Sequence, residues 1–348
     1  MSQQGADRVL LGHGSGGSLM HSLIEGCFAG AFEMRELLDS ALIEAGGARL
    51  AFTTDSFVVS PLFFPGGDIG ELSVYGTVND LSVAGAEPLF LSAGFIIEEG
   101  FPMDDLKRIV DSMSRAAGRA GVRIVTGDTK VVEKGKGDGI FINTAGIGFQ
   151  TFPPERDLYF SPARIRPGDA VIVSGEVGSH GIAVIAERNG LSFDPPLLSD
   201  LRPLNGLVKA MMPAAEGIRV MRDPTRGGLA TTLKEFAAAS GFRIRIRESE
   251  IPHLPPVKGA CELLGLDPLY AASEGALVAV ASPGVANYLV SLMRAHEYGI
   301  HSRIIGSVEG PGPSVGATAR KGQVVLETLA GGERMIDMLQ GQQLPRIC

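Results

Sequence analysis

The chain has 348 residues, of which 45% are hydrophobic and 20% are charged, so it can bury a sizeable core and lies far from the composition of disordered proteins. A chain of this length is expected to form two domains. The formal net charge of -8 argues against non-specific nucleic-acid binding, which needs a basic surface.

Neither a membrane span nor a secretory leader is expected. The sequence has no run of about 18 apolar residues, and its beginning, MSQQGADRVLLGHGSGG, has no apolar core of signal-peptide type. We therefore expect a cytoplasmic protein. The 47 glycines are compatible with phosphate-binding loops, although composition alone favours tight turns in a loop-rich fold.

The first half of the chain mixes helix-like and strand-like segments after a glycine-rich loop, GHGSGG, at 12–17. Apolar residues at helical spacing predict helices at 19–28, 71–84 and 103–120, of which the last has the clearest apolar stripe. Short apolar runs predict strands at 48–53, 57–59, 90–97, 122–125 and 140–149. The TGDTK segment after the fourth of these strands is expected to be a loop.

The proline-rich stretch from 151 to 167 is interpreted as a domain boundary. Beyond it, strands are predicted at 169–174, 242–247, 276–281 and 300–306, and helices at 182–188, 227–240, 261–264, 285–296 and 334–339. Each half of the chain is expected to form a mixed or antiparallel sheet with helices on one face. Two such units predict an α/β or α+β enzyme. The expected divisions are 1–155, 156–330 and a flexible tail, 331–348.

The three cysteines match neither a zinc site nor a redox motif. Cys27 and Cys261 have apolar neighbours and are expected to be small core residues. Cys348 differs, because it follows Leu-Pro-Arg-Ile at the end of the chain, where burial is least expected. Glycines in the tail favour a swinging arm, whereas simple fraying is the ordinary alternative.

Three aspartates are the candidate metal ligands. Asp55 follows a strand-like run, Asp80 ends a helical turn and Asp128 lies in the TGDTK segment. Mg²⁺ prefers oxygen ligands and commonly links carboxylates to substrate phosphates. Each aspartate alone is explained better as a turn former or helix cap, but together with the glycine-rich loop they favour a metal–nucleotide site.

Two glycine-containing motifs could face phosphates. The GHGSGG loop lacks the P-loop lysine and does not meet the Rossmann pattern, yet its backbone N–H groups could still bind an anion. Its candidate nucleotide-binding residues are His13, Gly14, Ser15 and Gly16. The RDPTRGG motif, with Asp223 and Arg226, precedes a predicted helix whose N-terminus would favour anions. A capped helix start explains that motif equally well.

The order of motifs resembles the HypE family of hydrogenase maturation proteins. The motifs are GHGSGG, TTDSF, GTVNDLSVAGAEPL, TGDTKVV, GSHG, RDPTRGG, ASEG and a terminal PRIC, and they span the chain from Gly12 to Cys348. More remotely, they resemble the ATP-binding superfamily of aminoimidazole ribonucleotide synthetase, selenophosphate synthetase and thiamine-monophosphate kinase. VNDLSVAGAEP and GDT are shared with that superfamily, whereas RDPTRGG and PRIC are the specific signals.

This resemblance implies a homodimer in which the two N-terminal sheets form one barrel, with ATP in the cleft between subunits and an α/β sandwich as the C-terminal domain. It implies ATP-dependent dehydration of a carbamoyl group on Cys348, from S-carboxamide to S-cyanate. A HypF-type carbamoyltransferase would load the carbamoyl group, and an iron-carrying HypC–HypD complex would receive the cyanide for the [NiFe] hydrogenase centre. ATP and Mg²⁺ are the implied cofactors, and Asn79 joins Asp80 among the nucleotide contacts.

The implied chemistry suits the residues. A thiol is both a nucleophile and a tolerable leaving group, as a carbamoyl carrier requires. Glu274, in the apolar setting AASEGALVAV, is the candidate base because burial would raise its pKa. Lys130 is the candidate for holding the carbamoyl oxygen, with Lys134 as second choice, and His180 and Arg226 are candidate phosphate contacts.

Two other functions stay open. A small-molecule kinase or synthetase of the same superfamily would have no reason to end in cysteine. A non-catalytic scaffold that docks maturation partners would not need acidic residues with this number and placement.

Overall fold

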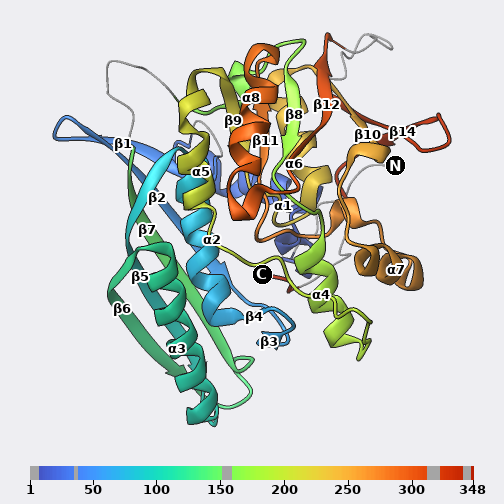
Figure 1. Ribbon diagram of the computed structural model, residues 1–348. Coiled ribbons are helices and arrows are strands. Elements are labelled where there is room, and N and C mark those ends of the chain that lie inside the picture. The colour runs from blue at the N-terminus through green and yellow to red at the C-terminus, as the bar shows by residue number, and fades with distance from the viewer. Residues whose placement is uncertain (1–7, 35–37, 151–158, 312–321, 340–345) are drawn as a thin grey trace.

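The chain forms two mixed α/β units, with the C-terminus lying between them (Figure 1). The structure, a computed structural model, describes residues 8–34, 38–150, 159–311, 322–339 and 346–348. Within these ranges no helix is both long and apolar enough to cross a bilayer. Residues 151–158 of the proline-rich boundary, and the tail glycine at 341, fall outside the described residues.

A five-stranded sheet with the order β1-β2-β7-β5-β6 builds the N-terminal unit. Its strands are β1 (Ala41–Ala45), β2 (Ala48–Phe57), β5 (Ala86–Glu98), β6 (Arg123–Val132) and β7 (Ile140–Gln150). Neighbouring strands are antiparallel except β5 and β6, which are parallel. The helices α2 (Ile69–Val83) and α3 (Met103–Ala120) lie together on one face (Figure 1).

The buried helix α2 positions part of the site, because it carries Asn79 and Asp80. It follows a two-stranded turn of β3 (Phe63–Phe64) and β4 (Gly67–Asp68). Asp68 caps it by accepting hydrogen bonds from the backbone N–H groups of Gly70 and Glu71. α2 is buried nearly all round, as expected for a helix packed between a sheet and other helices.

A seven-stranded sheet with the order β14-β13-β10-β12-β8-β11-β9 builds the C-terminal unit. Its strands are β8 (Ala170–Val173), β9 (Ile218–Arg222), β10 (Arg243–Arg247), β11 (Val278–Ala281), β12 (Arg303–Glu309), β13 (Gln323–Glu327) and β14 (Glu333–Ile336). Its helices are α4 (Ser179–Arg188), α5 (Asn205–Met211), α6 (Gly228–Ser240), α7 (Pro255–Leu264) and α8 (Pro283–Arg294).

Helices cover both faces of this second sheet. Val171 and Val173 of β8 pack in the cluster that contains α6, whereas Ala170 and Ile172 pack in the cluster that contains α5 and α8. This alternation follows from the two-residue period of a strand. The expectation of one covered face therefore holds for the first sheet only, and the second is the α/β sandwich that the resemblance implied.

Several local predictions are wrong. The TGDTK segment lies inside β6 and is not a loop. The predicted helix at 334–339 is instead the edge strand β14, whose backbone pairs with β13. Cys261 is buried as expected, but Cys27 is exposed on the turns after α1 (Ser18–Leu23).

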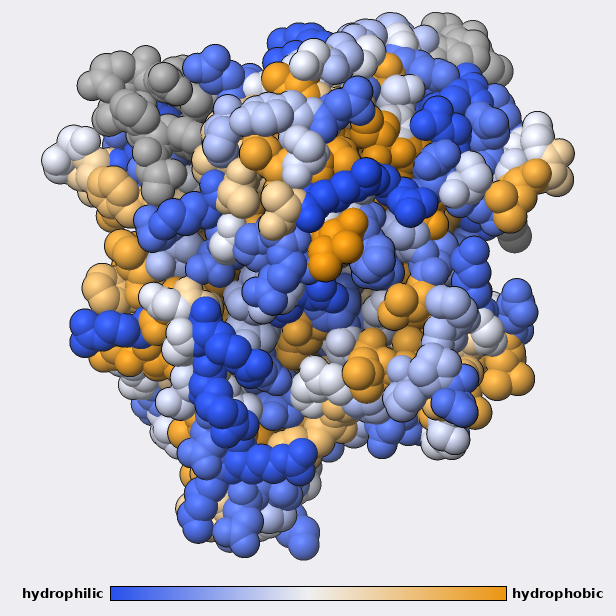
Figure 2. Space-filling model, in the orientation of Figure 1, coloured by the Kyte–Doolittle hydropathy of each residue, from blue (hydrophilic) through white to orange (hydrophobic). Residues whose placement is uncertain are grey.

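The face of the N-terminal sheet opposite α2 and α3 carries exposed apolar side chains. They include Phe52, Phe90, Ile96, Ile147 and Phe149. Figure 2 shows hydrophobic surface along its left margin, on the side where β1, β2 and β7 lie in Figure 1. A contiguous apolar face of this kind marks an interaction site in a globular protein.

Replacing Asp68 with Ala is expected to lower the free energy of unfolding by about 1–3 kcal/mol, because α2 loses its N-cap and the buried Ser112 hydroxyl loses an acceptor. Urea unfolding would measure the change. Asp104→Ala, at the exposed start of α3, is the matched control and should stay within about 0.5 kcal/mol of the parent. Equal losses in both variants would contradict this account of the cap.

Candidate active site

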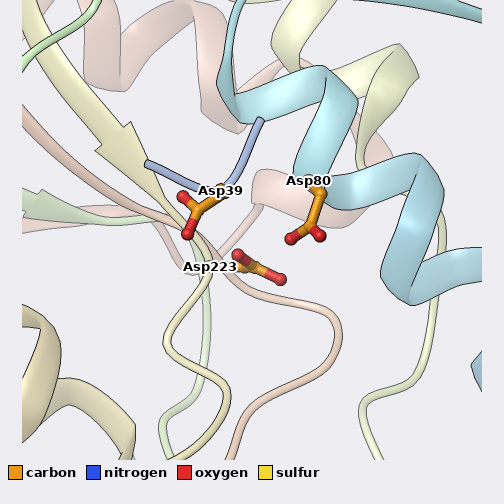
Figure 3. Close-up of side chains that lie close together, drawn as sticks. All are labelled: Asp39, Asp80 and Asp223. Carbon is orange, nitrogen blue, oxygen red and sulfur yellow. The ribbon is translucent and has the colours of Figure 1, made fainter. Parts of the chain in front are cut away.

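Three aspartates converge from separate elements at the junction of the two units. Asp39 lies two residues before β1, Asp80 lies in α2, and Asp223 directly follows β9. Figure 3 shows their carboxylates pointing toward one another. One oxygen from each lies within 4.8 Å of those of the other two, which is the separation expected of ligands that share one cation.

Mutual repulsion and burial of the three carboxylates disfavour their charged forms when no cation is bound. Burial, and then the charges of Asp223 and Asp39, raise the pKa of Asp80 well above its ordinary value. Burial and the charge of Asp39 raise the pKa of Asp223 to about 8. An all-carboxylate oxygen set in which negative charges crowd together fits Mg²⁺.

Neighbouring groups hold the cluster in place. The Thr53 hydroxyl lies 2.7 Å from the backbone oxygen of Asp39 and 3.0 Å from Oδ2 of Asp80. Arg222 Nε donates to Asp39 Oδ1 at 2.7 Å, and the same guanidinium pairs with Glu235. Asp39 is therefore both a cluster member and the partner of a fixed cation.

A cleft of about 1340 Å³ opens beside the cluster and is large enough for a nucleotide. Its lining includes Gly16, Asp55, Arg226 and Glu274 together with the three clustered aspartates. Arg226 Nη2 lies 3.6 Å from Asp55 Oδ1. The cleft thus combines clustered carboxylates with two arginine side chains, Arg222 and Arg226, an arrangement suited to a metal-bound polyphosphate.

Asp55 contributes charge to the site but is not one of the three clustered aspartates. Burial raises the pKa of Asp55, and the Arg226 guanidinium opposes that rise. Its charge in turn raises the pKa of Asp80. Among the described residues, the structure therefore groups Asp80 with Asp39 and Asp223, rather than with Asp55 and Asp128 as the sequence predicted.

Asp128 lies far from the cleft. It is on the edge strand β6, three strands from β2, which at about 4.8 Å per strand is about 14 Å. The pairing register aligns it with Ser56 rather than Asp55, so the two predicted ligands point to opposite faces of the sheet. Its carboxylate accepts from Lys130 Nζ at 2.6 Å, which lowers the pKa of Asp128.

Lys130 and Lys134 are both exposed and away from the cleft lining. Within a single copy of the chain Lys130 does not reach Cys348, so its contact with a carbamoyl group stays a prediction. The register places Lys130 beside Ile96, on the apolar outer face of the sheet.

Part of the glycine-rich loop reaches the cleft. Gly16 lines it at a φ of 75°, and a Cβ there would lie 2.6 Å from the Arg226 backbone. Only glycine permits both this conformation and this close approach. His13, Gly14 and Ser15 lie outside the lining, and the His13 ring and the Ser15 hydroxyl bond to the backbone of Leu10 and Leu11.

Asn79 joins the two units instead of facing the cleft. Its Nδ2 donates to the backbone oxygens of Arg202 and Glu274 at 3.2 and 3.1 Å, and its Oδ1 accepts from Leu204 N–H at 2.8 Å. The side chain is fully buried. Its predicted role as a nucleotide contact is thus replaced by a structural one next to Asp80.

Glu274 has the environment expected of a base with a raised pKa. Its side chain is 1% exposed, and among the described residues its Oε1 atom has no hydrogen-bond partner. Burial, and then the charges of Asp223 and Asp55, raise the pKa of Glu274 well above its ordinary value. An unpartnered buried carboxyl group at a cleft is typical of a group that meets its partner in a complex.

Cys348 does not line the cleft itself but lies near enough for the charged groups of the cleft to act on it. The charges of Arg226, Glu274, Asp55 and Asp223 all act on its thiol. Burial is the main cause that raises the pKa of Cys348 to about 12, and Arg226 opposes the rise. The thiol is therefore protonated at neutral pH while the chain end is in this position.

The sequence suggested that His180 contacts phosphate, but the structure places it away from the cleft lining. It is fully buried, and its Nε2 lies 2.9 Å from the backbone oxygen of Ile347. The histidine thus contacts the end of the tail.

Sequence reasoning missed Asp39 and its partner Arg222. Asp39 belongs to no motif, and the available signal is an acid two residues before the strand-like run ALIEA. Arg222 was noted only as part of RDPTRGG. Their pairing depends on contacts between residues 183 positions apart.

Comparison with known proteins agrees with this geometry. Residues 38–150 match the family described as AIR synthase related protein, N-terminal domain, and residues 166–317 match the corresponding C-terminal domain. The carbamoyl dehydratase HypE of Cupriavidus necator is 50% identical over 345 residues, which cover 98% of this chain and 95% of that protein.

Solved structures agree as well. A crystal structure of a HypE–HypF complex has a TM-score of 0.82 and 48% identity, covering 91% of this chain and 100% of that one. A crystal structure of HypE in complex with ATP has a TM-score of 0.80 and 46% identity, covering 98% and 100%. These matches confirm the two-domain AIR synthase-like fold, and the chain belongs to the carbamoyl dehydratase HypE family.

Proposed function

We propose that this protein uses ATP to dehydrate a carbamoyl group carried on Cys348, and so supplies the cyanide ligand of the [NiFe] hydrogenase iron. The observation that carries the proposal is the position of the terminal thiol, which lies near the acidic cleft, where the charges of Arg226 and Glu274 act on it. A small-molecule kinase of the same fold would have no use for this thiol. The carbamoyl dehydratases at about 50% identity support the same reaction.

The reaction converts R–S–C(=O)NH₂ and ATP into R–S–C≡N, ADP and phosphate. The carbamoyl oxygen attacks the γ-phosphorus and ADP leaves. The oxygen, which would leave poorly as hydroxide, can then leave as phosphate. Two protons leave the carbamoyl nitrogen as the C–O bond breaks and the nitrile forms. The side chain available to stabilise the transferring phosphoryl group is Arg226, which lines the cleft.

Glu274 is the proposed base for the carbamoyl nitrogen. Its buried, unpartnered Oε1 faces no competing donor among the described residues, and the raised pKa makes it a stronger base than an exposed glutamate. The backbone around it is fixed, because Asp200 accepts from the N–H groups of Glu274 and Gly275. A fixed base gains effective concentration toward a docked substrate.

ATP and Mg²⁺ are the proposed cofactors. Asp39, Asp80 and Asp223 would hold the cation, which when bound neutralises charge on the polyphosphate and on the clustered carboxylates. Gly16 and Gly17 of the glycine-rich loop would lie against the nucleotide. The ATP-bound HypE structure supports the nucleotide part of this proposal.

Two partners and a homodimer complete the proposal. A HypF-type carbamoyltransferase would load Cys348, as the HypE–HypF complex supports, and a HypC–HypD complex would accept the cyanide. Dimerisation would bury the outer apolar face of the N-terminal sheet in a shared barrel. It also offers a role for Asp128 and Lys130, which share that face and would then serve the partner's cleft.

Incubation with HypF, carbamoyl phosphate and ATP is expected to add a carbamoyl group to Cys348 and then to remove water from it. Intact-mass spectrometry with peptide mapping would follow both steps. The exposed Cys27→Ser variant is the matched control and should behave like the parent. A Cys348→Ser protein that still gained the carbamoyl mass would refute the assignment.

Glu274→Gln is expected to slow dehydration of the pre-carbamoylated enzyme by about 10²-fold or more, because general bases typically contribute 10²–10⁴-fold. Carbamoylation by the partner should be unchanged, since it needs only the thiol. Single-turnover mass spectrometry would measure both rates. Glu262→Gln, on the exposed side of α7, is the control. A Glu274→Gln enzyme with the parent's dehydration rate would exclude this base.

Ile147→Asp is expected to convert a dimer into monomers, because it places a charge in the centre of the outer sheet face. Light scattering coupled to gel filtration would report the mass. Val110→Asp, at an equally exposed apolar position on α3, should remain dimeric. The proposed barrel fails if the Ile147→Asp protein keeps the parent's mass.

A further inference from the structure

The last three residues lie against the segment that follows β2. The backbone N–H of Val58 donates to the Cys348 oxygen at 3.1 Å, and the N–H of Ser60 donates to the Arg346 oxygen at 3.2 Å. In return, Arg346 Nε donates to the Val58 oxygen at 2.9 Å. The chain end is thus held by hydrogen bonds of the kind that join strands, from a segment nearly 290 positions away in sequence.

One apolar side chain anchors this end. Ile347 is 5% exposed and belongs to the same hydrophobic cluster as Val59, Val184 and Ile185. Burying a side chain of this size stabilises the docked position by the transfer of its apolar surface from water. The anchor is adjacent to Cys348, so its seating limits how far the thiol can move.

The Ile347 carbonyl accepts its hydrogen bond from the opposite side, from His180 on α4. Nε2 of His180 lies 2.9 Å from that oxygen, and its Nδ1 lies 2.8 Å from the Ser199 hydroxyl. Phe64 packs edge-on against the imidazole, with ring centroids 5.2 Å apart. Figure 1 shows the chain end beside α4, between the two units.

The protonation of His180 follows from its partners. Burial lowers the pKa of His180 to about 4, so the ring is neutral near pH 7 and carries one N–H. A backbone carbonyl can only accept, which assigns that proton to Nε2. Nδ1 then accepts from Ser199, whose oxygen accepts in turn from Leu201 N–H at 3.1 Å. The hydrogen bonds from Leu201 through Ser199 and His180 to Ile347 therefore all run in one donor-to-acceptor direction.

The docked backbone is also strained. Arg346 has a φ of 54°, in the left-handed region that non-glycine residues rarely adopt. Such a conformation persists only where surrounding contacts fix it. On the solvent side, the Arg346 side chain pairs with Asp138, and Arg188 NH2 donates to the Arg346 oxygen at 2.8 Å. Exposed ion pairs of this kind contribute little, so the buried contacts at Ile347 carry most of the docking.

We propose that His180 is a positioning residue for the reaction: its Nε2–H fixes the Ile347 carbonyl and thereby holds Cys348 at the cleft. Without this donor, docking would bury an unpaired carbonyl, so the tail would leave the site more often. The catalytic meaning of this inference rests on the proposed function, whereas its first test needs neither ATP nor a carbamoyl group.

The first test is the rate at which iodoacetamide alkylates Cys348 in the full chain at pH 8, mapped by peptide mass spectrometry to separate it from Cys27. A docked thiol is protonated and shielded, whereas a released one has an ordinary pKa of about 8.5. His180→Phe keeps the ring and its packing on Phe64 but loses the donor, and alkylation should become about tenfold faster, the effect of losing one buried hydrogen bond. His180→Gln, which can donate from its amide, should restore slow alkylation.

Two further variants keep the outcome decisive. Ile347→Ala alters only the tail, so it tests docking even if a His180 variant does not fold, and it should also speed alkylation. His301→Phe, at an exposed histidine, should leave the rate unchanged. Docking is overturned if Ile347→Ala reacts at the parent's rate. The role of His180 is overturned if Ile347→Ala speeds alkylation while a folded His180→Phe protein does not.

The second test is single-turnover dehydration of pre-carbamoylated enzyme. His180→Phe should slow it by a smaller factor than alkylation rises, because alkylation reports the undocked fraction of tails and dehydration the docked fraction. His180→Gln should recover the parent's rate. Unslowed dehydration in His180→Phe would refute a positioning role. If the parent itself shows no dehydration, the proposed function fails, while the alkylation comparison still decides whether His180 docks the tail.

Discussion

The mutual repulsion of buried carboxylates is the constraint on which the site depends. Asp39, Asp80 and Asp223 come from three separate elements, and each is kept near the others although their proximity raises the pKa of Asp80 and Asp223. Such an arrangement is stable only because surrounding groups fix it and because fixed cations offset part of its charge. Arg222 does this for Asp39, and Arg226 does it for Asp55. The capped helix α2, the end of β9 and the glycine-rich loop all meet at this cleft.

The sequence predicted those parts of the fold that depend on local periodicity. The helix α3 spans 103–120 as predicted. A helix that packs on one face of a sheet buries one side, so its apolar residues recur at helical spacing in the sequence. Asp128 could not be placed in this way. Its distance from Asp55 depends on strand order and register, which are set by pairing between segments far apart in sequence. The same holds for Asp39, whose significance comes from partners at 80, 222 and 223.

The terminal thiol was predicted as the reacting group, but its setting was not. A swinging arm suggested an exposed, reactive cysteine, whereas the structure places Cys348 where burial raises its pKa to about 12. The neutral thiol and a neutral carbamoylated sulfur can both occupy this position without burying a charge, whereas a thiolate cannot. The position therefore favours the loaded and the resting forms of the tail over the nucleophilic form, and loading by a partner is expected to take place elsewhere.

Asn79 has a consequence for how substrates enter. Its side chain joins α2 to the backbone of Arg202, Leu204 and Glu274, so the elements that carry Asp80 and the proposed base are locked together across the junction of the two units. Relative rotation of the units would break three buried hydrogen bonds at once. Hinge motion of one unit against the other is therefore opposed by Asn79, whereas the chain end and the N-terminal loop lie outside this constraint.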